Sequence, residues 1–200
     1  MQGFYESGIK EKLDKITEFW LLNLLWVIVC LPILTIPPAT FALYHVLYKW
    51  VKNEGRGLSK EFFLGFKRYF GRSYLYFIGL TIIGLSAYYY YQMAVNNVLG
   101  VIIVVGMSVT VVITVLVLII NLYVIPFNVM LEATFKKTLV LSCVFAFKHF
   151  GLTLLLAVVL FITALFVFLL PYLSILAFIP AMVYFQNLLI YRRVLSEKKM

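Results

Sequence analysis

FWLLNLLWVIVCLPILTIPPATFALYHVLYKW, residues 19–50, is the stretch that decides the fold. It holds no charged residue before Lys49. A helix that crosses the hydrocarbon core of a bilayer needs roughly 20 residues, so this run is too long for one crossing and too short for two full ones. Pro32 and the pair Pro37 and Pro38 interrupt it, because proline removes a helical hydrogen bond and restricts the residue before it. The run predicts two short helices joined near Pro37 and Pro38.

The composition excludes a water-soluble globule. Apolar residues make up 64% of the 200 residues and charged residues 12%, with a mean hydropathy of +1.02. Soluble domains carry about 25% charged residues, so this chain has too little polar sequence to cover a core with a hydrated surface. We therefore predict an all-α, polytopic membrane protein. The net charge of +9 favours basic cytoplasmic loops near anionic lipid headgroups over nucleic-acid binding.

The positions of the basic residues predict the topology. All 17 Lys and Arg residues fall within residues 10–15, 49–72, 136–148 and 192–199. Because Lys and Arg mark the cytoplasmic side, each apolar stretch between two such segments should cross the membrane an even number of times. This predicts six membrane segments with both termini cytoplasmic, the first two forming a short, spanning or re-entrant hairpin. A competing topology has five spans and an external N-terminus.

Four longer transmembrane helices should follow the hairpin. The predicted spans are residues 73–91, 98–130, 152–170 and 173–191. The second is unusually long, so it should be tilted or kinked, with Pro126 as the break. Residues 1–200 are predicted to form a single integral membrane domain.

Amphipathic segments flank the hairpin on both sides. Residues 1–18 carry apolar side chains at helical spacing with charged residues between them, which predicts a cytoplasmic lead-in helix. Residues 58–72 predict an interfacial helix with an aromatic face and an opposite basic face. The basic face, which would bind lipid headgroups or dock a partner, consists of Lys60, Lys67, Arg68 and Arg72.

The chain has no motif that would indicate an enzyme. Metalloprotease, nucleotide-binding and serine-hydrolase signatures are absent from the sequence. His45 and His149 have no second ligand at metal spacing, and Cys30 and Cys143 lie in apolar surroundings without a CxxC motif. We therefore expect no catalytic residue, no metal site and no cofactor.

Asn121, Asn128 and Glu132 form the best polar constellation. Spacings of seven and four residues place them on roughly one helical face, and Pro126 between them frees a backbone carbonyl. Such a stripe beside a helix break can line a transport pathway. It can equally hold helices together, since amides hydrogen-bond across membrane helix interfaces. Both interpretations stay open, with helix packing favoured.

The broken hairpin also contains polar residues, among them Asn23 and His45. The helix ends at Pro37 and Pro38 leave backbone groups at membrane depth that must be buried in protein or face water. This requirement indicates either a functional site or a rigid packing element.

Several segments resemble a known family. NLLWVIVCLPILTIPPATFALYHVLYKWVKNEG, FFLGFKRYF and YVIPFNVMLEATFKKTLVLSCVFAFKH are similar to the YesL-like family of bacterial integral membrane proteins, a domain family of unknown function, with LPILTIPPAT the most specific part. The likeness covers most of the chain. It implies a bacterial plasma membrane location and an association with carbohydrate uptake, but no reaction and no ligand.

We therefore predict a non-enzymatic accessory or regulatory membrane component. The expected partners are anionic lipid headgroups and a carbohydrate transporter or sensor protein. The alternative is a small transporter or channel for a polar solute, working as a homo-oligomer, with Asn121, Asn128 and Glu132 along the path.

Overall fold

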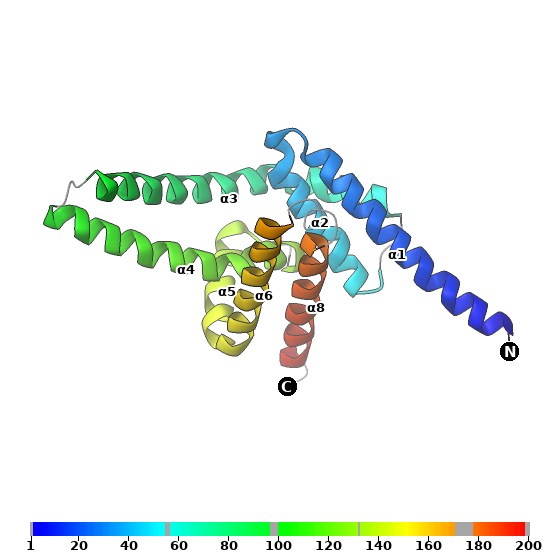
Figure 1. The fold of residues 1–200 in the computed structure, drawn as a ribbon. Coiled ribbons are helices and arrows are strands. Elements are labelled where there is room, and N and C mark those ends of the chain that lie inside the picture. The colour runs from blue at the N-terminus through cyan, green and yellow to red at the C-terminus, as the bar shows by residue number, and fades with distance from the viewer. Residues whose placement is uncertain (1, 55–56, 97–99, 132, 171–177, 199–200) are drawn as a thin grey trace. The chain divides into compact units, whose positions relative to one another are not determined.

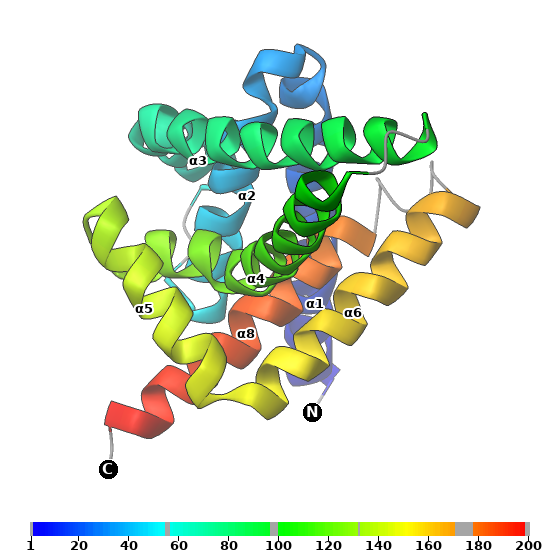
Figure 2. The same ribbon diagram turned by 90° about the vertical axis from the view of Figure 1, so that its left-hand side faces the viewer.

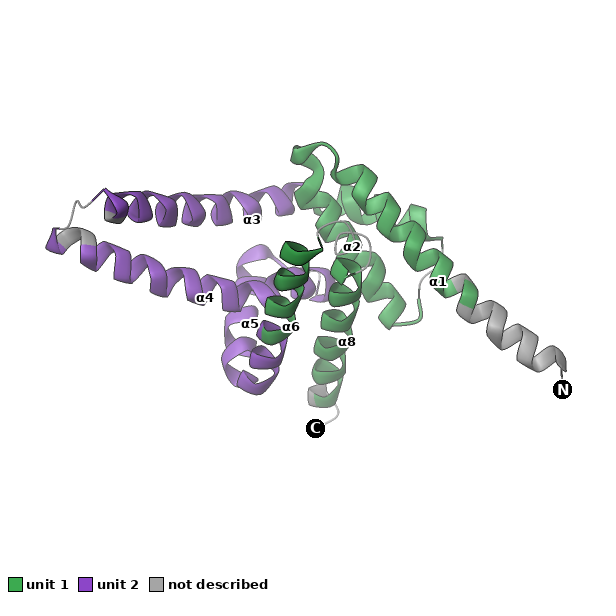
Figure 3. Ribbon diagram, in the orientation of Figure 1, with its two compact units in different colours: residues 1–69, 158–200 green, residues 70–157 purple. Residues whose placement is uncertain are grey.

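The computed structural model describes residues 2–54, 57–96, 100–131, 133–170 and 178–198 (Figure 1). All regular structure in these ranges is helical, which confirms the predicted all-α class. Three helical segments are long and apolar enough to cross a membrane: Leu58–Met93, Val104–Leu131 and Phe150–Leu169. The chain divides into two compact units (Figure 3). Unit 1 comprises residues 1–69 and 158–200, and unit 2 comprises residues 70–157.

Unit 1 begins with the broken hairpin. Helix α1, Gln2–Cys30, runs without a break from the charged lead-in into the apolar stretch, and a short 3-10 helix η1, Ile33–Thr35, connects it to α2, Ile36–Val51. Pro37 and Pro38 lie in the first turn of α2, where the backbone N–H groups have no intrahelical acceptor. Proline, which lacks this N–H, therefore removes no helical hydrogen bond there. The junction therefore lies at residues 31–35, with Pro32 inside it and the proline pair just after it.

Thr35 closes this junction. Its hydroxyl donates to the carbonyl of Val29 and to that of Pro32, the second at 2.6 Å. The last carbonyls of a helix have no intrahelical donor and need a partner when water is absent. The Thr35 hydroxyl is such a donor at the end of α1. It therefore satisfies a backbone carbonyl that the break in the helix leaves without an intrahelical partner.

Both apolar arms of the hairpin are short compared with the thickness of a bilayer core. At a rise of 1.5 Å per residue, the apolar part of α1 from Phe19 to Cys30 is roughly 18 Å long and α2 roughly 24 Å. A bilayer core is about 30 Å thick. Each arm is therefore shorter than one full crossing.

The core of unit 1 forms around α2. The run Phe41–Leu47 is buried on all sides, and α2 packs against α1 and against α8, Ile179–Lys198 (Figures 1 and 2). Ring contacts join α2 to its neighbours, among them Phe41 with Tyr69, at 5.9 Å between ring centroids, and Tyr48 with Tyr191, also at 5.9 Å. Segments from both ends of the chain thus share one core.

Helix α3, Leu58–Val95, joins two elements that the sequence analysis separated. The interfacial helix expected at 58–72 and the span expected at 73–91 are one continuous helix, which begins in unit 1 and continues in unit 2. The residues at the expected boundary, Gly71 to Ser73, are helical. One glycine in a long helix lowers its stability by about 1 kcal/mol and does not have to break it.

Unit 2 is built on α4, Val101–Leu131, which packs against α5, Phe135–Lys148 (Figure 2). Pro126 lies inside α4 without ending it. The sequence analysis assigned no element to the α5 segment, because its basic residues marked it as a loop. Helix α6, Phe150–Leu169, follows at once and matches the predicted span 152–170. The first residues of the last predicted span, 173–177, lie outside the described residues.

Candidate functional site

A polar cluster joins α2 to the first turns of α3 in unit 1. The Lys49 ammonium donates to the Glu61 carboxylate at 2.5 Å, and His45 Nε2 lies 3.6 Å from the same carboxylate oxygen. His45 and Lys49 lie one turn apart on α2, and Glu61 lies in the first turn of α3, where the helix dipole favours a negative charge. The cluster is therefore an ion pair with a histidine beside it, held by two helices.

His45 is enclosed by the same face of α3. Glu61, Gly65 and Tyr69 follow one another at helical spacing, and the Tyr69 ring centroid lies 5.8 Å from that of His45. His45 is only 6% exposed, and its Nδ1 has no hydrogen-bond partner among the described residues. Gly65 allows this close approach because it has no Cβ.

A second set of bonds joins α2 to α8. The Tyr44 hydroxyl donates to Gln186 Oε1 at 2.7 Å, and the Asn187 amide donates to the Tyr44 carbonyl at 3.3 Å. All three residues are buried. Neither Gln186 nor Asn187 was predicted as a site residue, although the two interrupt an apolar run, and a polar pair inside such a run is a recognisable signal.

These contacts hold α2 to α3 and to α8, and they leave no reactive group exposed. Lys49 neutralises Glu61, and His45 is shielded by Gly65 and Tyr69. Within the described ranges, no three His, Cys, Asp or Glu side chains gather as a metal site would require. The arrangement can resist separation of α2, α3 and α8, and it positions the surface residues of α3.

The opposite side of the first α3 turns is basic and exposed. Lys60, Lys67 and Arg68 are exposed, whereas Phe62 and Tyr69 on the aromatic side are buried in protein. Arg72, in unit 2, donates to the Ala133 carbonyl at 3.2 Å. Three of the four cations predicted for the basic face thus face outward, so that the basic face of the folded protein consists of Lys60, Lys67 and Arg68, without Arg72.

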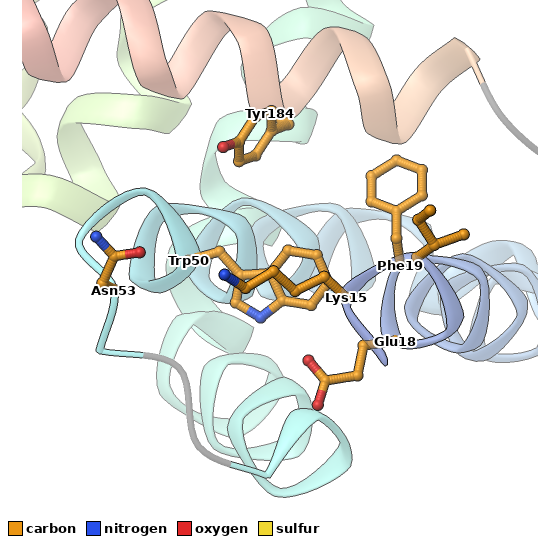
Figure 4. Close-up of a pocket in the computed structure, with 7 residues that line it drawn as sticks. Lys15, Glu18, Phe19, Trp50, Asn53 and Tyr184 are labelled. Atoms are coloured by element: carbon orange, nitrogen blue, oxygen red, sulfur yellow. The ribbon is translucent and has the colours of Figure 1, made fainter. Parts of the chain in front are cut away.

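A cavity of about 670 Å³ lies in unit 1, where α1, the end of α2 and α8 meet (Figure 4). The aromatic rings of Phe19, Trp50 and Tyr184 line it, one from each helix. Phe19 and Trp50 have ring centroids 6.4 Å apart. The polar lining consists of Lys15, Glu18 and Asn53. We call this space the α1 cavity.

Asn121 and Asn128, two of the three predicted polar residues, differ in their hydrogen bonding. The Asn121 amide oxygen accepts a hydrogen bond from the Tyr76 hydroxyl of α3, so it helps to hold two helices of unit 2 together. Asn128 is fully buried, and neither its amide nitrogen nor its amide oxygen has a partner among the described residues. Glu132, the third member of the predicted stripe, lies outside the described residues.

Asn23 in α1 resembles Asn128 in this respect. It is fully buried in unit 1, and both atoms of its amide lack a hydrogen-bond partner in the part of the chain that is described. Buried polar groups normally have a partner, because burying one without a compensating bond costs about 1–3 kcal/mol. At Asn23 and Asn128 a further polar group would therefore be stabilising.

Comparison with known proteins adds one family match. Residues 19–91 match the model of a family described as "Protein of unknown function, DUF624". This range includes the hairpin, the His45, Lys49 and Glu61 cluster and the basic face, so the expectation of a domain of unknown function is confirmed for this part of the chain. No curated protein and no solved structure showed significant similarity to the chain.

Proposed function

We propose that the protein is a non-enzymatic accessory or regulatory component of the bacterial plasma membrane that docks a partner through its basic face. The observation that carries this proposal is the contrast between the two sides of the first α3 turns. Lys60, Lys67 and Arg68 are exposed, while the opposite side is bound to α2 through Glu61, Gly65 and Tyr69.

A fixed basic surface suits electrostatic recognition. Charged groups that are held in place before binding lose less entropy when a partner arrives, and complementary charges raise the rate of association. The Lys49 and Glu61 pair and the packing of Tyr69 hold this part of α3 on α2, so the three cations need little reordering. The expected partner surface is acidic and lies on the cytoplasmic side.

The proposed topology has six membrane segments with both termini cytoplasmic. The short arms of α1 and α2 support a hairpin that enters and leaves on one side. The basic residues at 49–72 and 136–148 then share the cytoplasmic side with both ends of the chain. This placement puts the basic face where a cytoplasmic partner can reach it.

The proposed partner is a subunit of a carbohydrate uptake system or its sensor protein. This part of the proposal is supported only by the resemblance to the YesL-like family. Affinity purification of the full chain from cross-linked native membranes tests it. We expect such a subunit to co-purify in stoichiometric amount, and recovery of the protein alone would contradict the proposal.

A charge-reversal variant tests whether the partner binds at the basic face. Lys60→Glu/Lys67→Glu/Arg68→Glu should lose the partner while keeping the melting temperature, because all three side chains are exposed. Lys136→Glu/Lys137→Glu removes exposed cations from α5 and serves as the matched control. If both variants lose or both keep the partner, the basic face is not the docking surface.

A second candidate function is a small oligomeric transporter or channel for a polar solute. The amide of Asn128 is buried two residues after Pro126 and has no hydrogen-bond partner within the described ranges. It favours this candidate, because such a group gains a bond when a solute passes. Asn128→Leu should then abolish solute flux in liposomes without lowering stability. Asn121→Leu should lower stability instead, since it removes the bond to Tyr76. Unchanged flux in Asn128→Leu would contradict this candidate.

A further inference from the structure

Unit 2 contains a groove between α3 and α4 that the docking proposal does not use. The groove has a volume of about 270 Å³, and the first turns of α5 contribute to its lining. Leu75 is 56% exposed, so the groove is open there rather than sealed inside the protein. The apolar lining includes Leu75, Gly79 and Ile83 of α3, Val117 and Ile120 of α4, and Leu139 of α5.

The polar side chains among the described lining residues, Tyr76 and Asn121, are bonded to each other. The Tyr76 hydroxyl of α3 donates to the Asn121 amide oxygen of α4. A ligand that fills the groove therefore meets mainly aliphatic and aromatic carbon. Such a lining favours an apolar ligand.

The shape of the groove favours an extended chain. Helices α3 and α4 lie close together near the connection between them and diverge away from it (Figure 1). Near the connection, a Cβ atom on Gly106 would lie 2.8 Å from the Tyr90 ring, so the helices leave no space there. Farther along, the lining on α3 runs from Leu75 to Ile83, a length of roughly 12 Å. An α-helix with its side chains is about 10–12 Å wide, so a segment of that length would not fit into 270 Å³.

Arg72 places a positive charge at one end of the groove. It precedes Leu75 by three residues and Tyr76 by four, so it lies on the same face of α3, one helical turn beyond the lining. Its guanidinium donates to the Ala133 carbonyl at 3.2 Å, and Ala133 lies two residues before Phe135, which also lines the groove. This bond uses only part of the donor capacity of the guanidinium, a group that is suited to binding phosphate.

The first turn of α5 adds positive charge on the same side. Lys136 and Lys137 follow Phe135 and are exposed. In the proposed topology, residues 49–72 and 136–148 lie on the cytoplasmic side of the membrane. The charged end of the groove then lies at the level of the lipid headgroups, and the apolar part runs into the bilayer.

We propose that this groove binds one acyl chain of a phospholipid whose phosphate is held by Arg72. The chain lies along Leu75, Gly79 and Ile83. The phosphate and the acyl chain belong to one molecule, so both contacts contribute to the same binding event. A lipid without a phosphate gains only the apolar contact, and a free phosphate gains only the contact with the guanidinium. The depth of the groove follows from the proposed topology, but partner docking plays no part in the binding.

Native mass spectrometry of the full chain in detergent tests the proposal. The probes are phosphatidylglycerol and diacylglycerol with identical acyl chains, so that they differ only in the phosphate headgroup. We expect the protein to retain phosphatidylglycerol about threefold to tenfold better, the range for a charge-assisted contact that is partly exposed to water. Equal retention of the two lipids overturns the proposal.

Gly79→Leu tests the contact with the acyl chain. A Cβ atom at position 79 meets nothing within 4 Å, so the larger side chain extends into the groove and should lower retention of both lipids. Gly84→Leu in the same helix is the matched control, because a Cβ atom there also meets nothing within 4 Å and Gly84 lies outside the lining. If the two variants lower retention equally, the acyl chain does not lie in the groove and the proposal fails.

Arg72→Gln tests the contact with the phosphate. It should abolish the preference for phosphatidylglycerol and leave the retention of diacylglycerol unchanged. Arg68→Gln removes the same charge one turn earlier on α3 and should keep the preference. Equal effects of the two variants would mean that net charge holds the lipid, which overturns the proposal. Arg72→Lys keeps the charge even where the bond to Ala133 is lost, so it should retain most of the preference.

A second copy of the chain is the competing occupant of the groove. The same spectra report it, because they separate monomers from dimers. Monomers that retain the phospholipid support the proposal. Dimers that Gly79→Leu abolishes and Gly84→Leu preserves would overturn it. The site does not include the basic face, so failure of partner docking leaves this result unaffected.

Discussion

Gly65 of α3 lies directly against His45 of α2: a Cβ atom at position 65 would be 3.1 Å from the Cβ and Cδ2 atoms of His45. It would also lie 3.2 Å from the Cα atom of Ala42, which cannot move without shifting the α2 backbone. The two helices therefore meet so closely that a side chain at position 65 would require α2 to shift by a few tenths of an ångström. Side-chain rotation of His45 alone would not make room.

Gly65→Ala should consequently destabilise unit 1. Overpacking of a close helix contact costs about 1–3 kcal/mol, more than the gain of up to about 1 kcal/mol in helix propensity. Thermal unfolding of the purified protein in detergent measures the effect. Gly71→Ala in the same helix is the control, because a Cβ there meets nothing within 4 Å. Equal melting temperatures for the two variants would show that α2 and α3 are not in this contact.

Tyr44→Phe should destabilise the protein by about 1–2 kcal/mol, because the buried Gln186 acceptor loses its donor. Combined with Gln186→Leu, the loss should be smaller than the sum of the two single losses, since each single variant already removes the bond between the two side chains. Denaturant or thermal unfolding of the two single variants and the double variant forms the cycle. Tyr89→Phe, at an exposed ring, is the control and should be neutral. A purely additive double variant would contradict a direct bond.

Lys49 and Glu61 should show a measurable coupling energy. Their side chains are 29% and 16% exposed, so water screens the pair only in part. A double-mutant cycle with Lys49→Met and Glu61→Gln should give about 1 kcal/mol. The pair formed by Lys52 and Glu54 is more exposed and only two residues apart, so the same cycle there should give less. Similar values for both pairs would mean that burial adds nothing to the α2 and α3 contact.

Cysteine labelling tests the proposed topology. In a background with Cys30→Ala and Cys143→Ala, a membrane-impermeant thiol reagent added outside intact cells should label Asn96→Cys. The same reagent should not label Ser7→Cys or Ser59→Cys, because both positions are predicted to be cytoplasmic. Permeabilised cells provide the control for reactivity. Labelling of Ser7→Cys from outside would favour the five-span topology.

The sequence predicted the helical class, because long apolar runs without charge leave few alternatives to a helix. It also identified His45 and the cations at 60, 67 and 68 as notable residues. It did not predict their surroundings. The pairing of Glu61 with Lys49 joins two helices across a turn, and the spacing of residues within one helix carries no information about such a contact.

The helix α5 was not predicted, because Lys136, Lys137 and Lys148 were interpreted only as topology markers, although basic side chains are compatible with a helix. The hairpin junction lies near the proline pair, as predicted, and the pair itself lies in the first turn of α2, a position that accepts proline readily. The α1 cavity could not be found from sequence, since its three rings come from helices far apart in the chain.

The packing of α2 on α8 bears on how the protein is made. The run Phe41–Leu47 leaves the ribosome well before α8, which packs on it. Until α8 follows, the hairpin has two short apolar arms and an uncovered side, so it has little to hold it in the bilayer by itself. A chain that stops before α8 should therefore be a substrate for membrane quality-control proteases, because the core around α2 is completed by a helix that is synthesised much later.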